Sequence, residues 1–246
     1  MANVLSGTSG ALYYKPAGTS GTFTSANVAT VSDEITVQTY LNFKVNDEVQ
    51  FSDGGGSLPT GLSTGTDYYV IAYTASTGVL QVSATLGGAS VTISTTGTDG
   101  ASPFGVDFAE ALPVGDCREW SFEVNREELD TTTIGQALGQ YAPFRTFISG
   151  FADGSGSATV YYTDDDSSIA NRLIEDVIQR KQAGVEFKLY YDLTLSGSTP
   201  DDTVSTSITV PAVILSATYA VNPDDAQAIE VSFRPKSAPT FDFARS

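Results

Sequence analysis

The sequence contains no histidine, and its 246 residues include only one cysteine, one methionine and one tryptophan. Without histidine, the chain cannot build a Ser-His-Asp or Cys-His nucleophile or a histidine-ligated metal site. The single cysteine, Cys117, excludes an internal disulfide and a thiolate metal cluster. Any enzyme would have to work with carboxylates, tyrosine, lysine or arginine. The composition therefore favours an assembly or binding protein.

Basic residues are also scarce, with 12 Lys and Arg against 29 Asp and Glu, a net charge of −17. A protein that holds DNA or RNA draws much of its affinity from Lys and Arg, so nucleic acid is not expected as a specific ligand. No stretch approaches the roughly 20 apolar residues that span a bilayer, and the start lacks a signal-peptide pattern. We expect a soluble protein without a membrane partner.

Composition divides the chain into three zones. Residues 22–101 contain 24 Ser and Thr among 80 positions and a single basic residue, Lys44. The stretch 102–246 carries every arginine and the only tryptophan. A Gly- and Pro-rich segment at 97–103 separates the two and is typical of a loop. We therefore predict one domain formed by 1–21 and 102–246, with 22–101 inserted as a separate module.

Both parts are predicted to be mainly β. In the module, short β-prone runs alternate with turns, which indicates a small antiparallel barrel or sandwich. In the third zone, apolar and polar residues alternate with a period of two, as in strands with one buried and one solvent-facing side. The clearest alternation covers 120–125, 185–191 and 229–234.

One helix is predicted between Ser167 and Ala183, where the apolar period changes to that of an amphipathic helix. Charged residues, among them Arg172 and Asp176, lie away from the apolar face, and Gly184 is predicted to cap the C-terminus. We expect this helix to cover an opening of a β-barrel or to pack on one sheet. The predicted apolar face consists of Ile169, Leu173, Val177 and Ile178.

Acidic and glycine-rich clusters are given structural roles. Paired or triple carboxylates can serve glycoside hydrolysis or bind calcium, but no cluster has the spacing of a calcium loop, and turn, cap and surface roles explain them. The glycine-rich segments 54–56 and 153–157 lack the ending of a phosphate-binding loop and are predicted as hairpin turns. We predict no catalytic residue, no metal ligand and no cofactor. The acidic clusters are 127–130, 164–166, 201–202 and 224–225.

A strand beginning at Trp120 runs into the charged sequence Arg-Glu-Glu-Leu-Asp-Thr-Thr at 126–132. Together with 144–150, 158–162, the helix and the strand after it, this order resembles the major tail tube proteins of long-tailed bacteriophages. The resemblance covers about 145 residues and the strand near Leu12. It implies a tail-tube-like β-barrel or sandwich with one flanking α-helix, and a structural protein that is not an enzyme.

The resemblance also implies partners and location. Six copies would form a ring whose sheets join into a continuous inner barrel, and the rings would stack into a tube. Tape measure, tail terminator, baseplate and sheath proteins would be partners, and genomic DNA would be transient cargo ejected into the host. The protein would belong to the virion tail and be assembled in the host cytoplasm. Contractile and non-contractile tails stay open as alternatives.

Residues 22–101 separately resemble a β-module recurrent in phage tail proteins, on the patterns 45–51, 58–62, 66–71 and 87–88. Where such modules often have Gly-Asp before the strand, this chain has Asn46-Asp47. An 80-residue module would not fit a bore that passes DNA, so we expect it on the outer surface.

Two sets of residues are assigned as site hypotheses. The segment 127–133 is interpreted as an interface loop between rings or neighbouring subunits, because a long loop of mixed charge often serves an interface. An acidic bore would repel phosphates and let DNA slide, and Glu186 and Glu230 on solvent-facing strand sides are the candidates for facing it. The interface candidates are Arg126, Glu127, Glu128, Asp130, Thr131 and Thr132.

Three other functions remain alternatives from the sequence. Tyrosine pairs such as Tyr161-Tyr162 and Tyr190-Tyr191 could stack sugars, which would make the chain a carbohydrate-binding or adhesin-type tail protein. A carboxylate-dependent glycoside hydrolase is a second alternative. The tube of a contractile secretion system, which shares the architecture, is the third.

Overall fold

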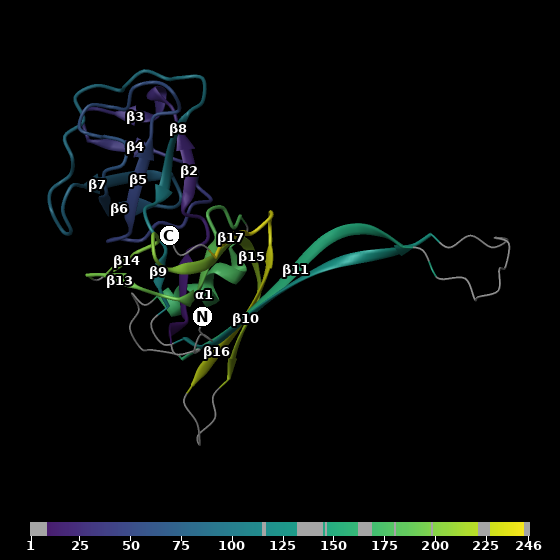
Figure 1. Ribbon diagram of the computed structural model, residues 1–246. Coiled ribbons are helices and arrows are strands. Elements are labelled where there is room, and N and C mark those ends of the chain that lie inside the picture. Colours follow the sequence, from purple (N-terminus) through teal and green to yellow (C-terminus); the bar gives the residue numbers. More distant parts are fainter. Residues whose placement is uncertain are drawn as a thin grey trace, which may run out of the picture.

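The computed structural model describes residues 9–114, 117–131, 145, 147–161, 169–179, 181–197, 199–220 and 227–243. Within these residues the chain forms two large antiparallel sheets and one α-helix, so the predicted mainly β fold with a single helix is confirmed. Figure 1 shows the two sheets as separate bodies, with a long hairpin that projects from the larger one.

The larger sheet has eight strands in the order β10-β11-β16-β15-β12-β1-β9, with β17 paired to β15. Its two ends, β10 and β9, do not pair with each other among the described residues, so this sheet is open and not closed into a barrel. Its strands are β1 (Ala11–Lys15), β9 (Leu112–Pro113), β10 (Cys117–Asp130), β11 (Phe147–Tyr161), β12 (Glu186–Asp192), β15 (Thr206–Ala220), β16 (Ala228–Pro235) and β17 (Thr240–Asp242).

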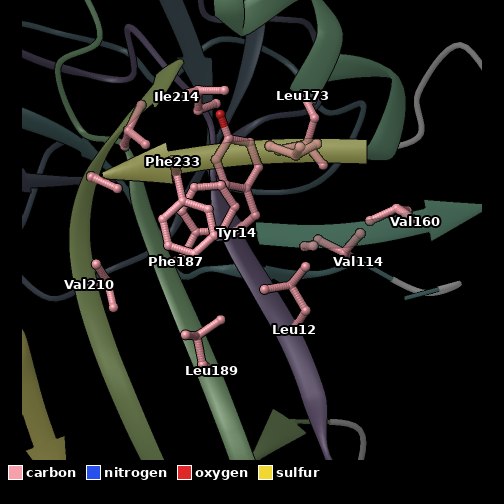
Figure 2. Close-up of a cluster of buried hydrophobic side chains, with 14 of the residues drawn as sticks. Leu12, Tyr14, Val114, Val160, Leu173, Phe187, Leu189, Val210, Ile214 and Phe233 are labelled. Carbon is pink, nitrogen blue, oxygen red and sulfur yellow. The ribbon is translucent and has the colours of Figure 1, made fainter. Parts of the chain in front are cut away.

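The core of this sheet lies on the side that the alternation predicted. Every second residue of β1, β12, β15 and β16 is buried, and the rings of Tyr14, Phe187 and Phe233 pack together at its centre (Figure 2). Leu173 from the helix enters the same cluster. The alternation breaks at Tyr13 and Tyr190, which are buried on the opposite side with their ring centroids 5.2 Å apart.

The helix α1 (Ile169–Ile178) packs on β15, which confirms that it lies on a sheet. Three expectations for it are corrected. The helix ends at Ile178, so Gly184, with φ +84°, shapes the turn before β12 instead of capping the helix. Ile178 is 86% exposed, whereas Arg172 and Asp176 are buried. Ser167 and Ser168, at the predicted start of the helix, lie outside the described residues.

The smaller sheet has seven strands in the order β2-β8-β5-β6-β7-β4-β3 and its own apolar core. It runs from Ser20 to Phe108, so its first and last strands lie at the joints with the larger sheet. Residues 91–93 lie outside the strands, and the amide of Val91 donates to the carbonyl of Val82 on β7 at 2.8 Å. The strands are β2 (Ser20–Phe23), β3 (Val28–Ala29), β4 (Glu34–Thr36), β5 (Glu48–Ser52), β6 (Tyr68–Thr74), β7 (Val79–Ser83) and β8 (Phe104–Phe108).

Two short strands, β13 (Leu195–Ser196) and β14 (Thr199–Pro200), form a separate small hairpin. The two glycine-rich segments, both predicted as turns, have different conformations in the structure. Gly54 and Gly55 adopt positive φ angles in a turn, as predicted. The segment 153–157 is not a turn but lies in the middle of β11. A Cβ atom at Gly156 would lie 2.2 Å from the ring of Phe233, so only glycine fits there. Glycine is used there for close packing inside a strand.

Candidate functional site

A two-stranded arm leaves the body of the larger sheet. β10 and β11 contain 14 and 15 residues, but β11 pairs with β16 only through Gly156–Tyr161. The remaining part of β11, residues 147–155, is paired with β10 alone and extends away from both sheets (Figure 1). At about 3.4 Å per residue this arm projects roughly 30 Å.

The predicted interface residues lie on this arm, but in a strand and not in a loop. Arg126, Glu127, Glu128 and Asp130 belong to β10, and Thr131 follows it. Thr132 lies outside the described residues. The strand continues through this charged stretch because β11 supplies its hydrogen-bonding partner, with an irregularity between Arg126 and Glu128.

The arm also carries exposed apolar side chains that the site hypotheses did not include. Leu129 and Ile148 oppose each other across the two strands and are both exposed. Phe147 is half exposed, and Phe151 is 87% exposed. Val124, opposite Gly154 on the same arm, is also half exposed. Isolated apolar residues are common on a surface, but five on one projecting hairpin are typical of a surface that contacts a partner. The signal in the sequence was the cluster of aromatic and β-branched residues at 147–151.

The side of β10, β11, β16 and β15 that faces away from the core is polar. Ser121, Ser157, Ser232 and Ser216 stand in register as a row across all four strands. Their hydroxyls bond in pairs, Ser121 with Ser157 at 2.9 Å and Ser216 with Ser232 at 2.6 Å. The side chains of this row are short and uncharged. We call this side of the four strands the hydroxyl face.

A second row on the hydroxyl face carries the acids. Glu119, Thr159, Glu230 and Thr218 are aligned by the same register, next to the row of serines. Glu230 is exposed there, which is one of the two acids predicted to face a bore. Two glutamates among small hydroxylic residues make this part of the face smooth and negative.

The other predicted acid, Glu186, lies elsewhere. It faces Lys15 across β12 and β1 and lines a cleft of about 170 Å³ that Lys188 and Asp202 also line. Burial by itself would raise the pKa of Asp202, but hydrogen bonds from Lys188 and Tyr190 outweigh it and lower that pKa. The cleft therefore combines both signs of charge. Within the part of the chain that the structure describes, no group of three or more acidic or Cys residues could hold a metal ion.

The two outer edges of the four-stranded part are open. β10 pairs with β11 on one side and with no strand on the other, among the described residues. On its side away from β16, β15 pairs with β12 only as far as Pro211. Unpaired strand edges present backbone N–H and C=O groups that a further strand can bind.

The smaller sheet is joined to helix α1 by a buried ion pair. The Nη1 atom of Arg172 lies 2.6 Å from Oδ1 of Asp47, and Nη2 donates to the carbonyl of Asn42 at 2.9 Å. Lys44 and Glu175 form an exposed second pair. Burial raises the pKa of Asp47 although Arg172 opposes the shift. The module is thus docked on the helix and not merely tethered.

None of the helices in the described ranges is long and apolar enough to cross a membrane.

Comparisons with known proteins gave structural matches only. No family model and no curated protein matches the chain. Among solved structures it is similar to the virion of a native gene transfer agent particle, with 18% identity over 53% of this chain and 88% of that chain, at a TM-score of 0.37. A chain from the tail of an empty gene transfer agent particle, solved with C6 symmetry, is 20% identical over 53% of this chain and 85% of that chain, with a TM-score of 0.37. A chain of the SPP1 tail tube is 17% identical over 56% of this chain and 70% of that chain, with a TM-score of 0.39.

Proposed function

We propose that this chain is the structural subunit of a phage-type tail tube, in which rings of six copies stack into a conduit for genomic DNA. The observation that carries the proposal is the four-stranded part of the larger sheet, which has two open edges, a polar outer face and a projecting arm. The ring size of six follows from the sequence resemblance.

The open edges suit a ring. The four strands alternate in direction, so β10 and β15 run antiparallel to each other. β15 of one copy can therefore pair antiparallel with β10 of the next, and the same contact repeated around an axis closes a ring. Such pairing satisfies both edges and turns the open sheets of single chains into one barrel.

The arm suits a contact between subunits or between stacked rings. Its exposed apolar pair, Leu129 and Ile148, would be buried there, and the charged residues 126–128 would align it. The charge reversals Arg126→Glu and Glu128→Arg should then leave the monomer folded but block polymerisation. Tubes of normal appearance from this double variant would contradict the role of the arm.

The hydroxyl face is proposed to line the bore. Short hydroxyl side chains and the carboxylates of Glu119 and Glu230 give this part of the face little that binds phosphate, so DNA can slide over it. Arg234 lies on the same side of β16, where Asp153 at 3.6 Å offsets its charge. Glu230 lies on this face and Glu186 in the cleft on β12, so Glu230 is the bore-facing acid that the geometry favours. A neutral or basic bore in an assembled tube would contradict this.

The remaining expectations rest on the resemblance. Tape measure, terminator, baseplate and sheath proteins are the proposed partners, and the virion tail, built in the host cytoplasm, is the proposed location. The module at 22–101 is proposed to lie on the outside of the tube, because it docks on α1, on the opposite side of the four strands from the hydroxyl face.

Negative-stain electron microscopy of the purified protein over a concentration series tests the proposal directly. Stacked rings with an open channel are expected. A protein that remains monomeric at high concentration and binds a defined sugar on a glycan array would contradict the tube and favour the carbohydrate-binding alternative. A tube whose gene lies among secretion-system genes would assign the same structure to a secretion apparatus.

A further inference from the structure

The backbone groups on one edge of β15 are hydrogen-bonded in turn by β12, by Val185 and by the side chain of Gln182. β12 pairs with β15 as far as Pro211. The amide of Ala212 then donates to the carbonyl of Val185 at 3.1 Å. At Ile214 the covering group is no longer backbone but the side chain of Gln182.

Gln182 imitates a paired strand at that point. Its Oε1 accepts from the amide of Ile214 at 2.7 Å, and its Nε2 donates to the carbonyl of Ile214 at 3.1 Å. Nε2 also donates to the carbonyl of Asp176 at 3.1 Å, which fixes the side chain to the helix. Both backbone hydrogen-bonding groups of Ile214 on this edge are therefore occupied.

Beyond Ile214 the edge changes character. Leu215 is an extra residue, a β-bulge that shifts the register between Ile214 and Ser216, and its side chain is exposed. From Leu215 to Thr218 no described strand pairs with this edge. The boundary between covered and open edge thus coincides with Gln182 and the bulge.

We propose that Gln182 fixes the register at which β10 of a second copy pairs with β15. This inference rests on the proposed function and identifies the residue that ends the contact. The second copy is the occupant that the chemistry fits, because Ser121 and Ser216 are the two ends of the row of serines. Joining these edges continues the hydroxyl face from one copy to the next.

The alternation of side chains cannot fix this register by itself. A slip of one residue would turn polar side chains toward the core, but a slip of two residues keeps every side chain on its own face. With Gln182 in place, a strand that slips two residues toward Ile214 finds both backbone groups already bonded. Gln182 therefore excludes the alternative that the pattern permits.

Disulfide mapping between copies tests the inference. In a Cys117→Ser background, Ser216→Cys is combined in turn with E119C, S121C, E123C or N125C on β10, and tubes are oxidised and analysed by mass spectrometry. One intermolecular link should predominate. With Gln182→Ala added, a second link should arise, shifted two residues toward the N-terminus of β10, since the strand can then also pair with Ile214.

Gln179→Ala is the matched control, because Gln179 lies in the same segment after helix α1 as Gln182 but donates to the carbonyl of Tyr40. It should leave the single link unchanged. Gln182→Met, which keeps the length of the side chain without its amide, serves if the alanine variant unfolds. An unshifted single link in both Gln182 variants would show that Gln182 does not fix the register, and it would not contradict the proposed tube. No tubes and no link in the unsubstituted background contradict the proposed function itself.

Discussion

Tyr14 and Asp176 show how a polar pair is held inside an apolar core. The phenol of Tyr14 donates to Oδ2 of Asp176 at 2.6 Å, and the amide of Ala17 donates to the same oxygen at 2.9 Å. Both side chains are fully buried. These bonds tie β1 to helix α1, which closes the core of the larger sheet.

Removing the phenol should therefore weaken the fold. Tyr14→Phe leaves the buried carboxylate with one donor fewer, and losing a hydrogen bond to a charged group costs about 1.5–3 kcal/mol. We expect the free energy of unfolding in urea to fall by about 2 kcal/mol at pH 7. Tyr13→Phe is the control, because Tyr13 points to the opposite face of β1. Equal effects of the two variants would contradict the role of the bond.

The same carboxyl predicts a pH dependence. Burial raises the pKa of Asp176, as it does for Asp47, so the folded chain binds protons more tightly than the unfolded chain. The free energy of unfolding should then fall as the pH rises from about 4, the ordinary aspartate value, through the raised pKa. Asp202, whose pKa is lowered, acts in the opposite sense as the pH falls.

Asp176→Asn isolates this contribution, since an amide oxygen can still accept from Tyr14 and Ala17. Urea unfolding between pH 4.5 and 8 should show a shallower fall of stability with pH than in the unsubstituted protein. Glu230→Gln removes one exposed charge and serves as the control for overall repulsion. An unchanged slope in Asp176→Asn would mean that this carboxyl is not the group responsible.

At the scale of elements, the sequence predicted what depends on local period and missed what depends on partners. The helix and the alternating strands around Phe187 and Val231 follow from periods of 3.6 and 2. Residues 127–130 of β10 are predicted from the sequence as part of a loop, because their charges give no alternation and their hydrogen bonds come from β11. Gly154 and Gly156 were predicted as a turn, since the close approach of Phe233 cannot be seen in the chain.

The arm makes a prediction of its own. Leu129→Ser with Ile148→Ser should leave monomer stability nearly unchanged, because both side chains are exposed in the single chain. If a partner buries them, about 3 kcal/mol of apolar burial is lost, which raises the critical concentration for assembly roughly a hundredfold. Sedimentation over a concentration series measures this critical concentration. Val31→Ser, at the fully exposed Val31 in the turn between β3 and β4, should leave the critical concentration unchanged, and equal effects of the two changes would contradict a specific contact of the arm.

At the scale of the molecule, the sequence predicted two compositional units but not how they meet. Arg172 and Asp47 are 125 positions apart, and Arg172 was predicted merely as a charged residue off the apolar face of the helix. Only the folded chain brings the helix, Asn42 and the loop before β5 together. Buried charges of this kind give no periodic signal, because their partner is set by tertiary structure.

This junction predicts a strong non-additivity. Arg172→Met alone leaves Asp47 buried without its partner, and breaking a buried pair in this way costs about 3–5 kcal/mol. Asp47→Leu alone should have a comparable effect, whereas the double variant should recover most of the loss, because a well-packed apolar pair can replace a buried ion pair. Lys44→Met, which breaks the exposed pair with Glu175, should cost less than about 1 kcal/mol.

Urea unfolding of the four proteins gives the coupling energy, and limited proteolysis of the segment 109–114 reports whether the module stays docked. In assembled tubes the single variants should blur the density of the module and leave the wall intact, because α1 keeps its apolar contacts with β15. A double variant that loses the sum of both single losses would show that the pair does not act as a unit. The module would then be oriented by the bond from Gln179 to the carbonyl of Tyr40 and by the amides of Gly18 and Thr19, which donate to the carbonyl of Ala183 and do not involve these charges.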